Sequence, residues 1–239
     1  MNPLSPTLLG AFIVGAFLLG SIPFALLIGL AKGTDIRAVG SKNPGATNLG
    51  RTFGFKWFLL CFALDAAKGL APTLAFGLLT DLASAPGMTP TSAFAWLAVM
   101  VAPVLGHMFS PWIGFKGGKG VATGLGALLG VYPILTIPGL GAFVVFATTL
   151  GIWRFVGLSS VLAAGSLPIW VWYFGELLRR GASTSGEPPP TTWPFLVVAI
   201  ALALLVIIKH KGNLARLAAG TEPKIGAAPD ENPERPRTS

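Results

Sequence analysis

Long apolar runs alternate with short polar segments along most of this chain. The first run, residues 8–30, contains 23 residues without a charge, and about 20 such residues suffice to cross a membrane as a helix. Later apolar runs cover residues 57–80, 93–113, 121–153, 155–175 and 193–208. This pattern predicts an all-α polytopic membrane protein. Because the first run lacks a basic start and a clear cleavage site, we interpret it as a retained span and not as a signal peptide.

Prolines and glycines interrupt two of these runs. The sequence Gly-Ser-Ile-Pro at residues 20–23 predicts a kink in the first span. The run 121–153 has 33 residues and would form a helix roughly 50 Å long at about 1.5 Å per residue, too long for one crossing. Pro133 and Pro138 predict a turn in its middle. We therefore expect two short spans here, and about seven transmembrane helices in all.

The cations between the spans predict an orientation. With seven spans, 14 of the Lys and Arg residues fall on one side and only Arg179 and Arg180 on the other. The positive-inside rule then places the N-terminus outside and the C-terminus in the cytoplasm. We expect residues 1–224 to form a single transmembrane domain. The charged, proline-bearing residues 225–239 are predicted to be a disordered cytoplasmic tail.

Composition agrees with this class and narrows the partners. Hydrophobic residues make up 53% of the chain and charged residues 11%, whereas a soluble chain carries about 25% charged residues. The single cysteine, Cys61, excludes a disulfide scaffold. The net charge is +8, but the cations lie between apolar runs. Membrane lipids and anionic substrates are therefore better partners than nucleic acid.

Several common catalytic motifs are absent from the sequence. There is no His-Glu-x-x-His or cysteine pair for a metal, and no G-x-S-x-G elbow for a serine nucleophile. Residues 115–120 are not a Walker A loop, because Gly120 stands where Ser or Thr must hold magnesium. A His-x-x-x-x-Asp motif is missing as well, since Trp112 follows His107 at the fifth place. We expect neither a metal nor another cofactor.

Three polar clusters share one predicted membrane face. They are residues 40–48 with Arg51, residues 106–109 leading into 116–123, and residues 210–216 closed by 220–224. Small residues let the backbone approach a ligand, hydroxyl and amide side chains add hydrogen bonds, and the cations add charge. These are the groups that bind phosphate. Glycines and lysines just before a helix also form an anion nest at its N-terminus.

Purely structural roles are the alternative for several of these residues. Lysines at the ends of spans anchor topology and contact headgroups. Asp65 and Lys68 lie three residues apart on one helix face and are expected to pair with each other. We expect His107 to pack between helices. The combination of Gly, Lys, Asn and hydroxyl residues in two loops on one face nevertheless favours a ligand site.

These clusters, in this order, resemble the bacterial PlsY family of membrane glycerol-3-phosphate acyltransferases that use acyl phosphate. The match is carried by Gly-Ser-Ile-Pro-Phe at 20–24, the cluster 40–48 with Arg51, Gly-His at 106–107 with residues 116–123, and residues 210–213 through Glu222. It runs from about residue 20 to residue 224. One departure is Gly157, where the family usually has serine; Ser159 and Ser160 remain.

The resemblance implies a multi-pass protein of the bacterial inner membrane with its active site on the cytoplasmic side. It implies acyl transfer from acyl phosphate to the 1-hydroxyl of sn-glycerol 3-phosphate, giving lysophosphatidate and phosphate, the first step of phospholipid biosynthesis. The chemistry of the residues fits, because both substrates carry phosphate and the donor needs an apolar groove. The donor is already activated and demands no covalent nucleophile. No oligomeric state is predicted.

Roles follow for the individual residues. We expect substrate phosphates to be held by Arg51 and Lys119, with Lys116 and the backbone amides of Gly117, Gly118 and Gly120 in support. Orientation by hydrogen bonding is expected from Ser41, Thr47 and Asn48, and a phosphate contact from Ser160. His210 and Asn213 are expected to reach the glycerol phosphate. Ser41, His210 and Asn213 are therefore the catalytic candidates.

The acceptor of the hydroxyl proton has two candidates. His210 has an ordinary pKa of about 6.5, which suits a general base. The phosphate of the donor can take the proton instead, as the resemblance implies. We favour the phosphate, because the lysines at positions 209 and 211 disfavour a further positive charge on His210.

Two other functions compete with the acyltransferase. An organic-phosphate membrane transporter also needs cations, but it usually places them near the bilayer midplane between internal repeats. Here the cations stand at the ends of spans and no repeat is evident. A noncatalytic lipid-binding scaffold accounts for the surface lysines but not for the Asn and Ser clusters.

Overall fold

The computed structural model describes residues 5–82, 88–186 and 190–225; the predicted disordered tail, residues 225–239, lies outside these ranges except for Ile225. The described residues form helices and no strands, which confirms the all-α prediction. The helices are α1 (Pro6–Ser21), α2 (Phe24–Ala31), α3 (Ala46–Phe53), α4 (Phe55–Leu79), α5 (Pro90–Met108), the 3₁₀ turn η2 (Pro111–Ile113), α6 (Val121–Gly130), α7 (Thr136–Trp153), α8 (Val156–Ser185), α9 (Trp193–Lys209) and α10 (Lys211–Ala218).

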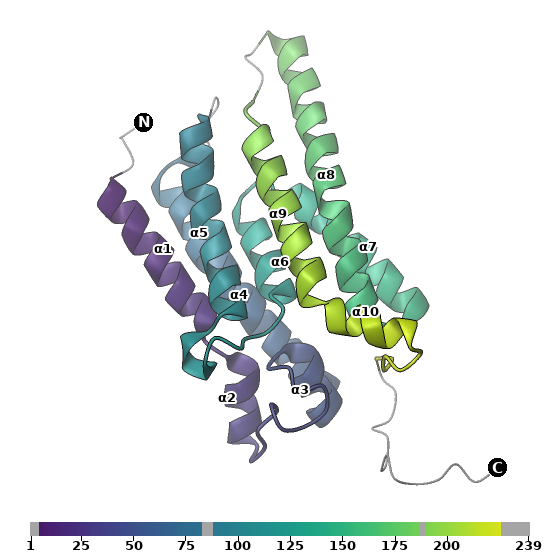
Figure 1. Ribbon diagram of the computed structural model, residues 1–239. Helices are drawn as coiled ribbons and strands as arrows, with labels where there is room; N and C mark the ends of the chain where they lie inside the picture. The colour runs from purple at the N-terminus through teal and green to yellow at the C-terminus, as the bar shows by residue number, and fades with distance from the viewer. Residues whose placement is uncertain (1–4, 83–87, 187–189, 226–239) are drawn as a thin grey trace, which may run out of the picture.

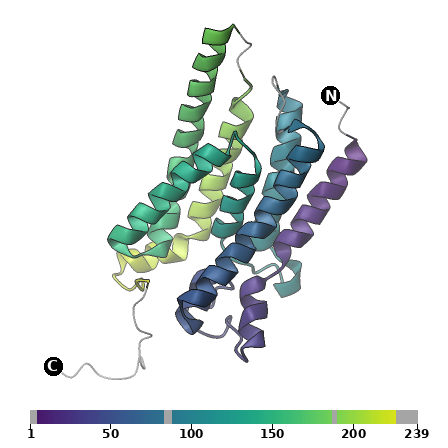
Figure 2. The ribbon, with the colours of Figure 1, turned by 180° about the vertical axis from the view of Figure 1, so that it is seen from behind.

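The helices form one elongated bundle. The chain changes direction along the bundle through α1, α4, α5, α6, α7, α8 and α9, and the short α6 covers only part of its length (Figures 1 and 2). The short helices α2, α3 and α10 and the link between α5 and α6 gather at one end, which we call the α10 end (Figure 1). The three polar clusters of the sequence therefore lie at the same end of the bundle.

Both predicted breaks are present. The first run is divided between α1 and α2 at Ile22 and Pro23, where proline cannot donate a backbone hydrogen bond. The run 121–153 is divided between α6 and α7, with Pro133 in the turn. Pro138 does not take part in that turn. It is the third residue of α7, where the first turn of a helix tolerates proline.

The eighth helix is longer than the sequence pattern suggests. We predicted a span ending at residue 175 and a polar connection after it, but α8 continues to Ser185. Within the extension Glu176 pairs with Arg179 at 2.7 Å and with Arg180 at 3.0 Å, three and four residues along the helix, and such pairs support a helical conformation. The helix ends at Gly186, which adopts a left-handed conformation with φ 74°.

Length and apolar composition support a membrane protein. Within the described part of the chain, five segments are long and apolar enough to cross a membrane: residues 6–31, 55–79, 90–113, 136–153 and 156–185. The pair α9 and α10, bent by 53°, makes a sixth if it is one span. Helix α6 has only 10 residues, about 15 Å at 1.5 Å per residue. The count of seven crossings and the orientation stay predictions.

Small residues let α4 and α6 pack closely. A Cβ atom added to Gly126 would collide with the carbonyl of Ala66, and one added to Gly69 with the carbonyl of Thr123. Small residues at such crossings are typical of membrane helices. The close packing holds the start of α6, and the lysine just before it, beside the middle of α4.

Candidate active site

A cleft opens at the α10 end of the bundle. It is bounded by the segment leading into α3, by the middle of α4, by the start of α6 and by the starts of α8 and α10. The polar and glycine residues that line it are Ser41, Asn43, Gly45, Thr47, Asn48, Arg51, Asp65, His107, Lys119, Gly120, Gly157, Ser160, His210 and Asn213. The structure therefore joins all three polar clusters around one cavity.

Two cations face this cleft from different elements. Arg51 stands near the end of α3, and Lys119 stands two residues before α6. Burial lowers the pKa of Lys119 to about 8, although the nearby carboxylate of Glu222 opposes the shift. Burial also lowers the pKa of Arg51 from its usual range, but arginine stays charged in proteins. Both side chains are half-buried, and half-buried cations that line a cleft favour an anionic ligand.

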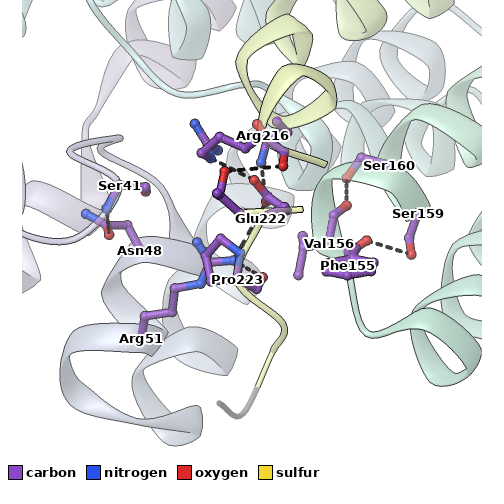
Figure 3. Close-up of polar contacts among 12 residues, drawn as sticks. Ser41, Asn48, Arg51, Phe155, Val156, Ser159, Ser160, Arg216, Glu222 and Pro223 are labelled. Carbon is purple, nitrogen blue, oxygen red and sulfur yellow. Dashed lines mark hydrogen bonds and ion pairs between the residues drawn. The ribbon is translucent and has the colours of Figure 1, made fainter. Parts of the chain in front are cut away.

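The C-terminal segment closes one side of the cleft. The carboxylate of Glu222 is only 1% exposed and accepts hydrogen bonds from Asn213 Nδ2 at 2.7 Å and Arg216 Nε at 2.8 Å. Arg51 Nη2 lies 4.0 Å from the same carboxylate and donates to the carbonyl of Pro223 at 3.1 Å (Figure 3). Lys119 Nζ donates to Asn213 Oδ1. Glu222 thus links the cations, a role that its sequence motif alone did not indicate.

Asn48 organises the loop before α3. Its amide nitrogen donates to the carbonyls of Ile36 at 2.8 Å and Val39 at 3.1 Å, and its Oδ1 accepts from the backbone N–H of Ser41 at 2.9 Å (Figure 3). The buried amide is therefore satisfied by its own loop. Ser41 is exposed and Thr47 half-buried, and both line the cleft.

The glycine loop before α6 uses its amides differently from the predicted anion nest. Gly117 N–H donates to the carbonyl of Met108 at 3.2 Å, and Gly118 N–H donates to the carbonyl of His107 at 3.1 Å. Both donors are engaged within the protein, and neither residue lines the cleft. Gly120 does line it, in a left-handed conformation with φ 78°. Lys116 is exposed and lies outside the cleft lining.

His210 lies between α9 and α10 and lines the cleft. Its side chain is buried, and Nδ1 lies 2.8 Å from the carbonyl of Val206, so Nδ1 carries the proton and Nε2 keeps a lone pair. Burial lowers the pKa of His210 to about 4, and Lys119 adds to this effect. The neutral imidazole that we predicted follows mainly from burial, not from the two lysines beside it in sequence.

The start of α8 places one serine in the cleft and packs closely against Asn213. Ser160 lines the cleft, whereas Ser159 does not. Each hydroxyl donates to the carbonyl four residues earlier, Ser160 to Val156 and Ser159 to Phe155 (Figure 3). At Gly157 an added Cβ atom would stand 2.6 Å from Cβ of Asn213. The glycine that departs from the family pattern therefore leaves room for Asn213.

An apolar groove adjoins the polar cleft. It runs between α6, α7, α8 and α9 and is lined almost wholly by apolar and small side chains such as Leu125, Phe143 and Leu167. Phe62, Gly120, Val121, Phe146 and Ser160 line both cavities. The site therefore offers charged groups and an apolar channel at one junction, as an amphiphilic ligand requires.

Asp65 and His107 are cleft residues that sequence reasoning placed only in helix packing. Both side chains line the cavity. Asp65 does pair with Lys68, at 2.7 Å, as predicted. Their spacing revealed the pair, but nothing in the sequence showed that α4 and α5 meet at this cavity. Among the described residues, no three His, Cys, Asp or Glu side chains gather in a way that could hold a metal ion.

Comparison with known proteins points to one family. The family model for glycerol-3-phosphate acyltransferase matches residues 10–220. The glycerol-3-phosphate acyltransferase of Trichlorobacter lovleyi is 40% identical over 216 residues, which cover 90% of this chain and 97% of the relative. That of Anaeromyxobacter dehalogenans is 41% identical over 227 residues, covering 93% of this chain and 100% of the relative.

Solved structures agree with the sequence comparison. The crystal structure of PlsY, an integral membrane glycerol 3-phosphate acyltransferase, in its glycerol 3-phosphate form is 34% identical, with a TM-score of 0.75, and the match covers 91% of this chain and 96% of that one. The lysophosphatidic acid form matches with a TM-score of 0.69 over 91% of this chain and 95% of that one. Sequence and fold agree, and this chain belongs to the glycerol-3-phosphate acyltransferase family.

Proposed function

We propose that this acyltransferase takes its acyl group from acyl phosphate and transfers it to the 1-hydroxyl of sn-glycerol 3-phosphate. The products are lysophosphatidate and inorganic phosphate. The observation that carries the proposal is the junction of a cationic cleft with an apolar groove, which share Phe62, Gly120, Val121, Phe146 and Ser160. An acyl phosphate has a charged head and a fatty chain and can occupy both cavities at once.

The roles of the cleft residues follow from their charge and position. Arg51 and Lys119, which come from different elements and line the same cleft, bind the substrate phosphates, because each phosphate needs a cation in a partly dry site. Ser41, Thr47 and Ser160 line the same cavity and orient the substrates through their hydroxyls. Membership of the family supports glycerol 3-phosphate as the acceptor, since the matched crystal structure is a glycerol 3-phosphate form.

The reaction needs no covalent intermediate on the protein. The acceptor oxygen attacks the carbonyl carbon of the mixed anhydride, the ester bond forms, and the bond to the phosphate oxygen breaks with its electron pair. Lys119 and Arg51 stabilise the charge that develops on the departing phosphate. Asn213, held between Lys119 and Glu222, keeps the ammonium group of Lys119 aimed at the cleft.

The departing phosphate is the better acceptor for the hydroxyl proton. Because burial lowers the pKa of His210 to about 4, its imidazole is a weak base at neutral pH. Its Nε2 lone pair can accept a hydrogen bond from the glycerol hydroxyl and orient it. Asn213 and His210 therefore position the acceptor, and the donor phosphate takes the proton.

The same proposal gives the protein a place in the cell. The cationic cleft lies at the α10 end, together with most of the Lys and Arg residues, and the positive-inside rule places such a face in the cytoplasm. The protein is then a multi-pass protein of the bacterial inner membrane that draws glycerol 3-phosphate from the cytoplasm and the acyl donor from the bilayer.

A donor comparison tests the proposal. Purified protein in detergent receives labelled glycerol 3-phosphate with either palmitoyl phosphate or palmitoyl-CoA, and lysophosphatidate is measured. We expect product with palmitoyl phosphate and none above background with palmitoyl-CoA; His-x-x-x-x-Asp, which coenzyme A–dependent enzymes of this reaction generally carry, is absent from the sequence. The Lys119→Ala variant serves as the inactive control. Equal rates with the two donors would contradict the proposal.

A further inference from the structure

A group of buried ionisable side chains lies between α4 and α5, beneath the cleft. Asp65 and Lys68 come from α4 and His107 comes from α5, and these residues are 2%, 3% and 9% exposed. Charged groups inside membrane helices are costly and usually have a functional reason. The roles given above to Arg51, Lys119, His210 and Asn213 leave this group unused.

Lys68 is fully occupied by structural contacts. Its ammonium lies 2.7 Å from Asp65 Oδ1 and donates to the carbonyl of Ile22 at 2.8 Å, at the break between α1 and α2. The ring of Phe24 lies 5.4 Å away on the same side. Lys68 therefore ties α4 to the broken first span, and it neutralises Asp65. It does not reach the cleft lining.

Asp65 also faces the imidazole of His107. The distance from Asp65 Oδ1 to His107 Nδ1 is 3.6 Å, and Oδ2 lies 3.6 Å from the thiol of Cys61. The carboxylate is therefore enclosed by Lys68, His107 and Cys61. At this distance the carboxylate acts on the imidazole by charge and not through a hydrogen bond, and it favours the ring orientation in which Nδ1 faces Asp65 and Nε2 is directed away.

The far side of His107 meets the glycine loop. A Cβ atom added to Gly118 would collide with His107 Nε2, and one added to Gly117 would collide with the carbonyl of His107. The same carbonyl accepts the backbone N–H of Gly118 at 3.1 Å. The loop thus rests on the imidazole and the backbone of one residue. Lys119, the next residue, lines the cleft.

We propose that Asp65 and His107 are positioning residues that seat the glycine loop and so place Lys119 for phosphate binding. The proposal rests on the proposed function in one respect, the role of Lys119 as a phosphate contact. Asp65 orients the imidazole, the imidazole supports Gly118, and the position of Gly118 sets where the next side chain emerges. Only glycine at position 118 leaves space for the ring.

The expected defect is in binding and not in the chemical step. His107→Asn and Asp65→Asn should raise the KM for glycerol 3-phosphate about 10-fold and leave kcat within about threefold, because each keeps a polar group but loosens the seat of the loop. The shape of the pH profile should not change. Direct binding of glycerol 3-phosphate to the detergent-solubilised protein should weaken in parallel, and this measurement needs no acyl donor.

Asp65→Asn leaves Lys68 unpaired, and the protein then misfolds if Lys68 needs its partner. Gly118→Ala, alone and combined with His107→Ala, tests the proposal in that case. Gly118→Ala should weaken binding more than 10-fold, because the added methyl group meets the imidazole. His107→Ala in the same chain removes the obstacle, so the double variant should bind glycerol 3-phosphate more tightly than Gly118→Ala alone. A double variant that is no better than Gly118→Ala would overturn the proposal.

A matched control separates positioning from general stability. Trp96→Phe removes another buried link between α5 and α4, the bond from Trp96 Nε1 to the carbonyl of Thr73 at 2.9 Å, away from the loop. It should lower the melting temperature and leave KM unchanged. If His107→Asn folds normally with KM within twofold of wild type, the loop does not depend on it. If instead kcat falls 100-fold at unchanged KM, His107 acts in the chemistry and the positioning role is wrong.

Discussion

Arg51 and Lys119 both line the cleft, and replacing either of them by alanine tests the proposed phosphate site. Arg51→Ala and Lys119→Ala should each reduce kcat/KM by at least about 10²-fold. The side chains come from α3 and from the loop before α6, and both line one cavity. Because the two side chains are held by different elements, each substitution should reduce the activity even when the other cation is present.

The magnitude follows from the burial of the two groups. A hydrogen bond to a charged partner contributes roughly 1.5–3 kcal/mol, and a tenfold change in rate corresponds to about 1.4 kcal/mol. The contact alone therefore accounts for a loss of roughly 10- to 150-fold. Both cations are half-buried, and burial lowers the pKa of Lys119 to about 8. Misplacement of the reacting groups adds to the loss.

A conservative variant in the cleft, and variants of arginines far from it, distinguish loss of phosphate binding from a general effect of charge. Arg51→Lys should recover only part of the activity, because lysine cannot form the two parallel hydrogen bonds that arginine offers a phosphate. Arg179→Ala and Arg180→Ala are the matched controls. Their side chains are 58% and 77% exposed near the end of α8, and each pairs only with Glu176 among the described residues. These two variants should stay within a few-fold of wild type.

Steady-state rates with varied glycerol 3-phosphate provide the measurement, after yield and melting temperature have been checked for each variant. If Arg51→Ala and Lys119→Ala fold normally and keep near wild-type activity, the phosphate site is wrong and these cations are headgroup anchors. Equal losses in all four alanine variants would show a general effect of charge and would also refute the reasoning.

Two further predictions concern pH and orientation. Because the pKa of Lys119 is lowered to about 8, its charge is present below that pH and is lost above it. The ratio kcat/KM should therefore fall as pH rises past about 8, Lys119→Arg should move that decline to higher pH, and a flat profile up to pH 10 would contradict this role. For orientation, an impermeant thiol reagent applied to spheroplasts should label Ser185→Cys and spare Ser41→Cys, with little background because Cys61 is buried; the opposite labelling would reverse the proposed topology.

The sequence alone was sufficient for the class of fold and for the position of its breaks. Uncharged runs that long have few stable alternatives to membrane helices, since a lipid environment requires every backbone group to be satisfied within the segment. Proline marks the breaks for a local reason, the missing N–H, and both the division after α1 and the one after α6 follow. The motifs also indicated the family, which the comparisons confirmed.

Tertiary structure decided which of the candidate groups are free to bind a ligand. The amides of Asn48, Gly117 and Gly118 looked available in sequence, yet each donates to a carbonyl of the protein. The extension of α8 past residue 175 is different, because its Glu176 ion pairs lie three and four residues apart and are a local signal that the sequence already contained.

The cleft itself depends on contacts between distant parts of the chain. Lys119 meets Asn213 across 94 residues, and Arg51 meets Pro223 across 172. Asp65 and His107 reach the same cavity from two neighbouring helices. Local pattern reveals which residues can bind phosphate, because charge and small size belong to the residue. It does not reveal which partner satisfies each group, because that choice is made by the packing of helices that are far apart in sequence.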